Sequence, residues 1–254
     1  MRTLILLRHG ESAWNARNLF TGWADVDLTA RGAQQARECG ALLCAAGLAP
    51  DAVHTSVLTR AVRTAALVAQ SADRHRVPVH AHWRLNERHY GALQGREKSE
   101  VLREFGEERF LLWRRSYDAA PPPVAEGAAG DVSHDPRYAH VPRGLLPRTE
   151  SLADVTARLL PYWHEAVVPD LRAGRTTLVV AHSNALRALV AHLDRLDREE
   201  VPALNIPTAM PLRYDLGKDL VPLVRGGRYL DPPAAEAAAA EVAAEGFRSS
   251  RASR

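Results

Sequence analysis

The sequence predicts an α/β protein, a three-layer sandwich in which helices flank a mostly parallel sheet. Two apolar runs without polar alternation, 3–7 and 176–181, indicate strands buried on both faces of such a sheet. Segments with helical spacing lie between the strand-like runs, as in proteins with a parallel sheet. Within two residues of each buried run comes a histidine, His9 or His182. Because ligands bind outside the carboxyl ends of such strands, these histidines and Arg8 predict a shared anion site.

The other elements follow from apolar spacing and from glycine and proline positions. Helices are expected over 29–47, 56–72, 99–117, 150–171, 185–193 and 234–244. Shorter strands are expected over 51–55, 77–79 and 212–216. Pro161 lies inside one of these helices and should kink or restart it.

Two segments stand apart from this alternation of strands and helices. Residues 118–148 contain three consecutive prolines and also Gly127 and Gly130, which argue against regular structure there. A loop of that length in a compact domain is usually functional or disordered, and we interpret it as lid-like. Residues 231–254 form an alanine-rich and then Ser/Arg-rich tail. The expected organisation is a catalytic domain over 1–230, containing the lid-like segment, followed by this tail.

Bulk composition is that of a soluble globular protein. Of the 254 residues, 46% are hydrophobic and 25% are charged. No apolar run reaches the ~18–20 residues that a membrane-spanning helix needs. The apolar stretch after Arg2 is also too short for a signal peptide. We therefore expect a cytoplasmic protein with no membrane partner.

The charge pattern favours a small anionic ligand. The formal net charge is +3, and no long basic run or aromatic-interleaved basic patch indicates a nucleic-acid partner. Arginine is the main basic residue, and its guanidinium matches phosphate and carboxylate groups bidentately. Cys39 and Cys44 are too few and wrongly spaced for a zinc site.

The residue types favour phosphoryl transfer without a metal ion. The sequence has no glycine-rich phosphate loop ending in Lys-Ser/Thr and no obvious aspartate cluster that would hold magnesium. A neutral imidazole can act as a nucleophile and form a covalent intermediate. A nearby carboxylic acid could donate a proton to the leaving oxygen and later retrieve one.

Several sequence blocks resemble a known family. The block 7–15, Leu-Arg-His-Gly-Glu-Ser-Ala-Trp-Asn, resembles the signature of the histidine phosphatase superfamily. Further blocks narrow the resemblance to the 2,3-bisphosphoglycerate-dependent phosphoglycerate mutases, and they lie at 20–23, 55–61, 85–95, 113–115, 135–139 and 205–208. The resemblance covers roughly residues 1–230. It implies a glycolytic and gluconeogenic isomerase that interconverts 3- and 2-phosphoglycerate through a phosphohistidine, with 2,3-bisphosphoglycerate as primer and no metal.

The resemblance also implies a role for each matching position. His9 would carry the phosphoryl group, and Glu87 would serve as acid and base for the substrate hydroxyl. The residues that would hold the phosphoryl oxygens are Arg8, Arg60, His182 and the backbone of Asn184. The residues that would bind the rest of the substrate are Ser12, Asn15, Thr21, Gly22, Arg88, Tyr90, Lys98, Arg114, Arg115, Ser183 and Asn184.

Without the resemblance, elementary physical chemistry supports some of these roles better than others. A cation near a helix start opposes the helix dipole, so Arg60 is better explained as facing an anion. Glu87 beside Arg88 is equally well explained as a surface ion pair. Arg114 and Arg115 lie near a helix end that favours cations in any case, so only the resemblance gives them a ligand.

The chain departs from the family pattern at two places. Ser183 stands where the family usually has glycine, and it could either crowd the turn or add a hydroxyl donor to phosphate. Ala209 and Met210 likewise replace a pair that usually contains glycine.

Three functions remain open from the sequence. The first is the mutase, acting on a small phosphorylated carboxylate. The second is a phosphatase of the same superfamily. The third is a catalytically weak paralogue that binds phosphorylated ligands, or a partner through its tail. Self-association into a homo-oligomer is left open, as is the choice between a housekeeping and a specialised copy.

Overall fold

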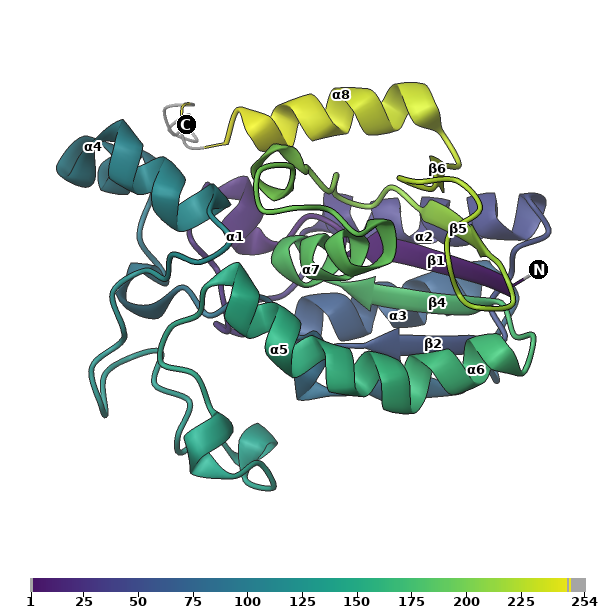
Figure 1. Cartoon of the computed structure of the whole chain (residues 1–254), viewed down its shortest axis with the longest axis horizontal. Coiled ribbons are helices and arrows are strands. Elements are labelled where there is room, and N and C mark those ends of the chain that lie inside the picture. The colour runs from purple at the N-terminus through teal and green to yellow at the C-terminus, as the bar shows by residue number, and fades with distance from the viewer. Residues whose placement is uncertain (1, 246, 248–254) are drawn as a thin grey trace.

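A six-stranded sheet forms the middle layer of the fold (Figure 1). The computed structural model describes residues 2–245 and 247, so the Ser/Arg-rich end expected over 248–254 lies outside the described residues. The strands are β1 Arg2–Arg8, β2 Ala52–Thr55, β3 Val79–Ala81, β4 Thr177–Ala181, β5 Leu212–Leu216 and β6 Arg228–Tyr229. Their order is β3-β2-β4-β1-β5-β6. The pairs from β3 to β1 are parallel and the two pairs beyond β1 are antiparallel, so the sheet is mixed.

The register of the central strands brings the two predicted histidines together. In the parallel pair of β1 and β4, Arg8 lies opposite Ala181. The backbone N–H of His9 then donates to the carbonyl of Ala181 at 3.0 Å. His9 and His182 therefore leave the sheet side by side at the same edge, as the sequence predicts.

Alternate residues of the central strands face opposite helical layers. Ile5 and Leu7 of β1 pack in one cluster with apolar side chains of α2 Ala30–Ala45 and α3 Thr59–Ser71. Leu4 and Leu6 pack in the other cluster with α5 Leu152–Tyr162, α6 Val168–Arg172 and α7 Ser183–Asp194. Burial of both faces explains why these strands lack polar alternation.

The remaining helices lie around the carboxyl edge of the sheet or across its end (Figure 1). They are α1 Ala13–Ala16, α4 Lys98–Arg115 and α8 Pro232–Ala243. The predicted restart at Pro161 is confirmed, because a π-helical turn, Trp163–Val167, separates α5 from α6. A kink in α4 at Gly106, where φ is +78°, was not expected from the sequence. No helix of the described residues is long and apolar enough to cross a membrane.

The segment 118–148 contains only two short 3₁₀ turns, Pro136–Tyr138 and Arg143–Leu145. It is nevertheless anchored, because Tyr138 is buried and packs on the ring of Trp23 at a centroid distance of 4.9 Å. The absence of regular elements is therefore compensated by a small aromatic cluster that ties the segment to the 21–23 loop.

Candidate active site

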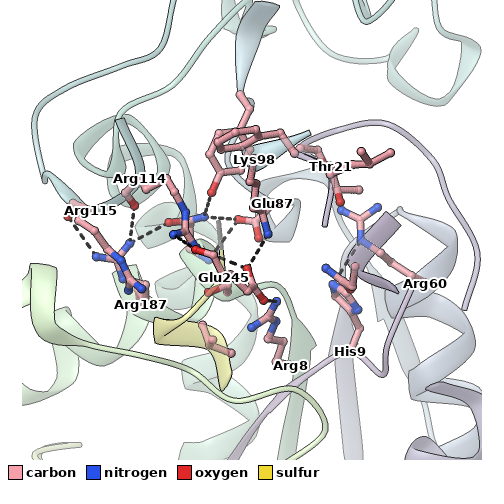
Figure 2. Close-up of a pocket in the computed structure, with 18 residues that line it drawn as sticks. Arg8, His9, Thr21, Arg60, Glu87, Lys98, Arg114, Arg115, Arg187 and Glu245 are labelled. Atoms are coloured by element: carbon pink, nitrogen blue, oxygen red, sulfur yellow. Dashed lines mark hydrogen bonds and ion pairs between the residues drawn. The ribbon is translucent and has the colours of Figure 1, made fainter. Parts of the chain in front are cut away.

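A pocket that is partly open to solvent lies beyond the carboxyl ends of β1 and β4 (Figure 2). The predicted site residues that line it are Arg8, His9, Asn15, Thr21, Gly22, Arg60, Glu87, Tyr90, Lys98, Arg114, Arg115, Ser183 and Asn184. Three further predicted residues, Ser12, Arg88 and His182, lie buried outside this lining. The described residues contain no group of three or more His, Cys, Asp or Glu side chains arranged to hold a metal ion.

His9 presents one ring nitrogen as an electron-pair donor. Its Nδ1 lies 2.7 Å from the carbonyl oxygen of Gly10, and a carbonyl only accepts, so Nδ1 carries the hydrogen. Nε2 therefore has the lone pair, and it accepts a hydrogen bond from Nε of Arg60 at 3.3 Å. Burial, reinforced by the charges of Arg60 and Arg8, holds the pKa of His9 well below its usual range. The ring is thus neutral and able to act as a nucleophile.

The ring of His182 packs against the ring of His9. The two rings meet edge to face with centroids 5.0 Å apart. Burial lowers the pKa of His182 far below its ordinary value, and the charges of Arg60 and nearby cations add to this effect. Nε2 of His182 is hydrogen-bonded to the Ser56 hydroxyl at 2.7 Å, whereas its buried Nδ1 has no partner among the described residues.

Arg8 and Arg60 are held mainly by backbone carbonyls, and Arg8 also lies 3.9 Å from Oε1 of Glu245. Arg60, in the first turn of α3, donates to the carbonyls of Ala24 at 2.9 Å and Gly22 at 2.8 Å. Arg8 donates to the carbonyl of Ile206 at 3.0 Å. Both side chains are buried, so their positive charge is concentrated on the pocket around His9.

Glu87 has one oxygen saturated with donors. Its Oε1 accepts from the backbone N–H of Arg88 at 2.7 Å and of Asn184 at 3.1 Å. It also accepts from the side-chain amide of Asn184 at 3.0 Å. The Glu87 carbonyl is fixed by Nε1 of Trp23 at 2.6 Å and by Arg158 at 2.9 Å. Within the described residues Oε2 has no recorded hydrogen bond, which leaves that oxygen for exchange with a ligand.

Arg88 does not form the surface ion pair with Glu87 that the sequence left open. The Arg88 guanidinium is fully buried and donates to the carbonyl of Trp113 at 2.6 Å. It lies 4.6 Å from the ring centroid of Tyr90. Burial alone would raise the pKa of Tyr90, but the charges of Arg88 and Arg114 lower it. Arg88 therefore acts on the pocket through Tyr90, and not by lining it.

The far end of the pocket contains a carboxylate from the tail (Figure 2). Oε2 of Glu245 lies 2.5 Å from Nζ of Lys98 and 3.4 Å from a guanidinium nitrogen of Arg114. Arg114 also donates to the Glu245 backbone carbonyl at 2.6 Å. Burial would raise the pKa of Glu245, yet Lys98, Arg8 and Arg114 lower it to about 2. The Glu245 carboxylate thus binds cationic side chains to which the family resemblance assigns the substrate.

The two departures from the family pattern have different structural settings. Ser183 is the first residue of α7 and is not among the residues with positive φ, so a serine fits this turn without backbone strain. Ala209 has a φ of +54°, in the left-handed region that favours glycine. Its N–H donates to the carbonyl of Arg8 at 3.1 Å, so the strained residue lies beside the site.

Sequence reasoning missed three residues of the site. Arg187 and Glu245 line the pocket, and Ser56 is bonded to His182. Arg187 follows Asn184 by three positions on one helix, a spacing that puts both on one face and could have drawn attention to it. Glu245 carried no comparable local signal. Glu245 belongs to the expected tail but lines the same pocket as residues of the expected catalytic domain, 1–230. The division of the chain at residue 230 therefore stays a prediction.

Comparisons with known proteins agree on the family. Residues 4–221 match the Histidine phosphatase superfamily (branch 1). The chain is 60% identical over 243 residues to a 2,3-bisphosphoglycerate-dependent phosphoglycerate mutase of Streptomyces avermitilis, covering 96% of each chain. It is 57% identical to a protein of the same name from Thermobifida fusca, covering 97% of this chain and 100% of the relative.

A solved structure of similar fold is named for another activity. It is a mycobacterial glucosyl-3-phosphoglycerate phosphatase complexed with VO3, with a TM-score of 0.68 and 26% identity. The match covers 90% of this chain and 96% of that one. The family match, the near-full-length relatives and the strand-end histidines agree, and the chain belongs to the histidine phosphatase superfamily, in the family of 2,3-bisphosphoglycerate-dependent phosphoglycerate mutases.

Proposed function

We propose that this protein interconverts 3-phosphoglycerate and 2-phosphoglycerate through a phosphohistidine at His9, with 2,3-bisphosphoglycerate as primer. The observation that carries the proposal is a single pocket with two cationic ends. Arg8 and Arg60 surround His9 at one end, and Lys98 and Arg114 lie at the other. Such a pocket fits a ligand with one anionic group to react and a second to be held. The names of the near-full-length relatives support the same activity.

The first chemical step is phosphoryl transfer to His9. Its Nε2 lone pair would attack the phosphorus of the bisphosphate, the bond from phosphorus to the substrate oxygen would break, and that oxygen would take a proton from Glu87. In the reverse step, deprotonated Glu87 would accept a proton from a substrate hydroxyl that attacks phospho-His9. When the acceptor is the free 2-hydroxyl of 3-phosphoglycerate, this step forms 2,3-bisphosphoglycerate. After the bisphosphate reorients, its 3-phosphoryl group would pass to His9 and the 3-oxygen would take a proton from Glu87, which releases 2-phosphoglycerate and restores phospho-His9.

Positive charge around His9 would stabilise the transferred group. Arg8 and Arg60 are already fixed by backbone carbonyls, so little reorganisation is needed when the phosphoryl oxygens gain charge. The buried His182 lies beside them, and its neutral ring can donate from Nδ1–H when Nε2 accepts from the Ser56 hydroxyl. Charge of this kind replaces the role that magnesium has in other phosphoryl-transfer enzymes.

The far end would hold the second anionic group while the ligand reorients. Lys98, Arg114 and Arg115 supply the charge, and Asn15 and Thr21 add polar groups to the lining of the same pocket. The remaining predicted residues contribute indirectly. Ser12 caps α1 and binds Asn15 at 2.8 Å, and Arg88 packs on Tyr90.

A phosphatase is the second candidate, and one observation favours it. The similar solved structure is named as a phosphatase, so this fold also supports transfer to water. The second cationic end favours transfer to a held ligand instead, because a ligand bound there would keep water from phospho-His9.

One set of assays separates these functions. Purified protein is supplied with 3-phosphoglycerate, with and without 2,3-bisphosphoglycerate and with excess EDTA, and 2-phosphoglycerate and inorganic phosphate are measured together. We expect isomerisation that depends on the primer and survives EDTA, with little phosphate release. Phosphate release without isomerisation would establish the phosphatase, and a requirement for added metal would overturn the proposed chemistry.

A further inference from the structure

Arg187 is a buried cation without a recorded carboxylate partner among the described residues. It lies in α7, one turn after Asn184, and only 2% of its surface is exposed. Burial, with the charges of Arg88 and Arg115, lowers its pKa to about 9, so it remains protonated at neutral pH. A buried unpaired charge is costly, whereas an apolar side chain would fill this space more cheaply. The presence of a buried arginine at this position therefore indicates a specific role.

The guanidinium of Arg187 donates hydrogen bonds to several acceptors. It donates to Oδ1 of Asn184 at 2.9 Å and to the carbonyl of Val201 at 2.9 Å. It also donates to the carbonyls of Arg115 at 3.2 Å and Arg114 at 3.4 Å. The same planar group thus binds α7, the end of α4 and the turn at Val201. A lysine ammonium has the charge but cannot reach this set of acceptors in one plane.

The bond to Asn184 decides which way its amide points. A guanidinium has donors only, so the atom of Asn184 that faces Arg187 must be the oxygen. The amide nitrogen must then face the other way, where it donates to Oε1 of Glu87 and to the Tyr90 hydroxyl, both at 3.0 Å. If the amide were reversed, its oxygen would face the Glu87 carboxylate and repel it.

The orientation of Asn184 in turn decides which oxygen of Glu87 is free. Both donors of Asn184, together with the Arg88 N–H, converge on Oε1. Oε2 is left to exchange a proton with the ligand. Meanwhile Arg187 holds the carbonyls of the two residues, Arg114 and Arg115, whose side chains form the far end of the pocket.

We propose that Arg187 is a positioning residue that acts through Asn184 to present Oε2 of Glu87 to the substrate hydroxyl. This inference rests on the proposed mutase function. Arg187 itself touches no reacting atom, so its loss should alter turnover and leave ligand affinity nearly unchanged.

The test is a double-mutant cycle. Arg187→Met, Arg187→Lys and Asn184→Ala are compared with wild type, and each Arg187 variant is also combined with Asn184→Ala. For each folded protein, kcat and KM for 3-phosphoglycerate are measured at saturating primer. We expect Arg187→Met to lower kcat about 10- to 100-fold with KM within about threefold of wild type. Arg187→Lys should lower kcat about three- to tenfold, because one ammonium replaces only part of the planar set.

Non-additivity is the deciding readout. In the Asn184→Ala background the loss of Arg187 should cost less than about threefold in kcat, because the group through which it acts is absent. Equal losses in both backgrounds, or an unchanged kcat in either single Arg187 variant, would overturn the proposal. If Arg187→Met does not fold, the Arg187→Lys half of the cycle gives the same decision. Wild-type isomerisation is measured first, so failure of the proposed function is seen separately.

Discussion

The two ends of the pocket hold their positive charge in different ways. At the His9 end, Arg8 and Arg60 donate to backbone carbonyls that belong to the folded loops. At the far end, Lys98 and Arg114 bind the carboxylate of Glu245, which comes from the turn after α8. The cations of the first end are therefore fixed by the fold before a ligand arrives, with Oε1 of Glu245 as a more distant neighbour of Arg8 at 3.9 Å. The cations of the second end directly bind a group of the chain itself.

The two ends of the site therefore have different tasks, stabilisation of the reacting group at the His9 end and exchange of anions at the far end. Fixed cations lower the cost of charge development in the reacting group, because they need not reorganise. Cations bound to a displaceable carboxylate exchange one anion for another when a ligand binds. We expect substitutions at the His9 end to change chemistry and substitutions at the far end to change affinity.

The largest effect should come from His9→Ala at the fixed end. Removing Nε2 removes the nucleophile that faces Arg60 in the pocket, so isomerisation should fall to background. Intact-mass analysis after incubation with 2,3-bisphosphoglycerate should show one phosphate on wild type and none on the variant. His134→Ala, an exposed histidine, serves as the control and should remain phosphorylated. Phosphate on His9→Ala would disprove the assignment.

The next largest effect should come from Glu87→Gln. Glutamine retains an oxygen for the three donors that converge on Oε1 but loses the titratable proton. General acid–base groups contribute typically about 10²–10⁴-fold, so kcat should fall at least about 100-fold with KM nearly unchanged. Steady-state kinetics gives both values. A near-normal kcat would mean that Glu87 only orders the loop.

A smaller effect of the opposite kind is expected from Glu245→Gln at the far end. Without its charge the tail should compete less well for Lys98 and Arg114, so KM for 3-phosphoglycerate should fall about three- to tenfold with kcat within about twofold. Because the pKa of Glu245 is lowered to about 2, the carboxylate is ionised at neutral pH. The ratio of wild-type to variant KM should therefore be constant between about pH 6 and pH 8.

The control for this change is Glu241→Gln, which neutralises an exposed carboxylate on α8 itself. It should leave KM unchanged. Equal shifts in the two variants would assign the effect to the general charge of the tail. An unchanged KM in Glu245→Gln would remove the contrast between the two ends.

The smallest effect should come from Ala209→Gly beside Arg8. Relief of the left-handed conformation should gain about 1–2 kcal/mol. Loss of a buried methyl group costs about 0.8 kcal/mol, and the freedom of glycine in the unfolded chain costs about 0.5–1 kcal/mol. The free energy of unfolding should therefore change by less than about 1 kcal/mol, with kcat unaffected. Ala65→Gly, in the buried face of α3, has no strain to relieve and should lower the free energy of unfolding by more, as thermal unfolding would show.

Local patterns predicted the fixed end of the pocket well. His9 and His182 follow apolar strands, and the parallel register of β1 and β4 brings them together, as the general rule for such sheets requires. The restart at Pro161 also followed from local chemistry, since proline cannot donate in a helix. In each case the determining residues are neighbours in sequence or belong to one strand pair.

The far end depends on contacts that no local pattern records. Glu245 reaches Lys98 across 147 positions of sequence, and its helix is an alanine-rich segment with no charge pattern pointing to the pocket. The two-residue strand β6 was missed for a related reason, since it exists only through its pairing with β5. Arg187 was missed because an arginine on a helix is usually exposed, and only packing shows that this one is buried.

The carboxylate of Glu245 has a further consequence for selectivity. It is a covalently attached competitor, so its local concentration is set by the length and stiffness of the tail and is not altered by dilution. A ligand with a single anionic group beside His9 would leave the tail on Lys98 and Arg114 but share Arg8 with the Glu245 carboxylate. A ligand with two anionic groups gains from both ends only by displacing it. The pocket therefore favours ligands that have two anionic groups. Small monoanions and free phosphate gain less binding free energy from it than the bisphosphate does.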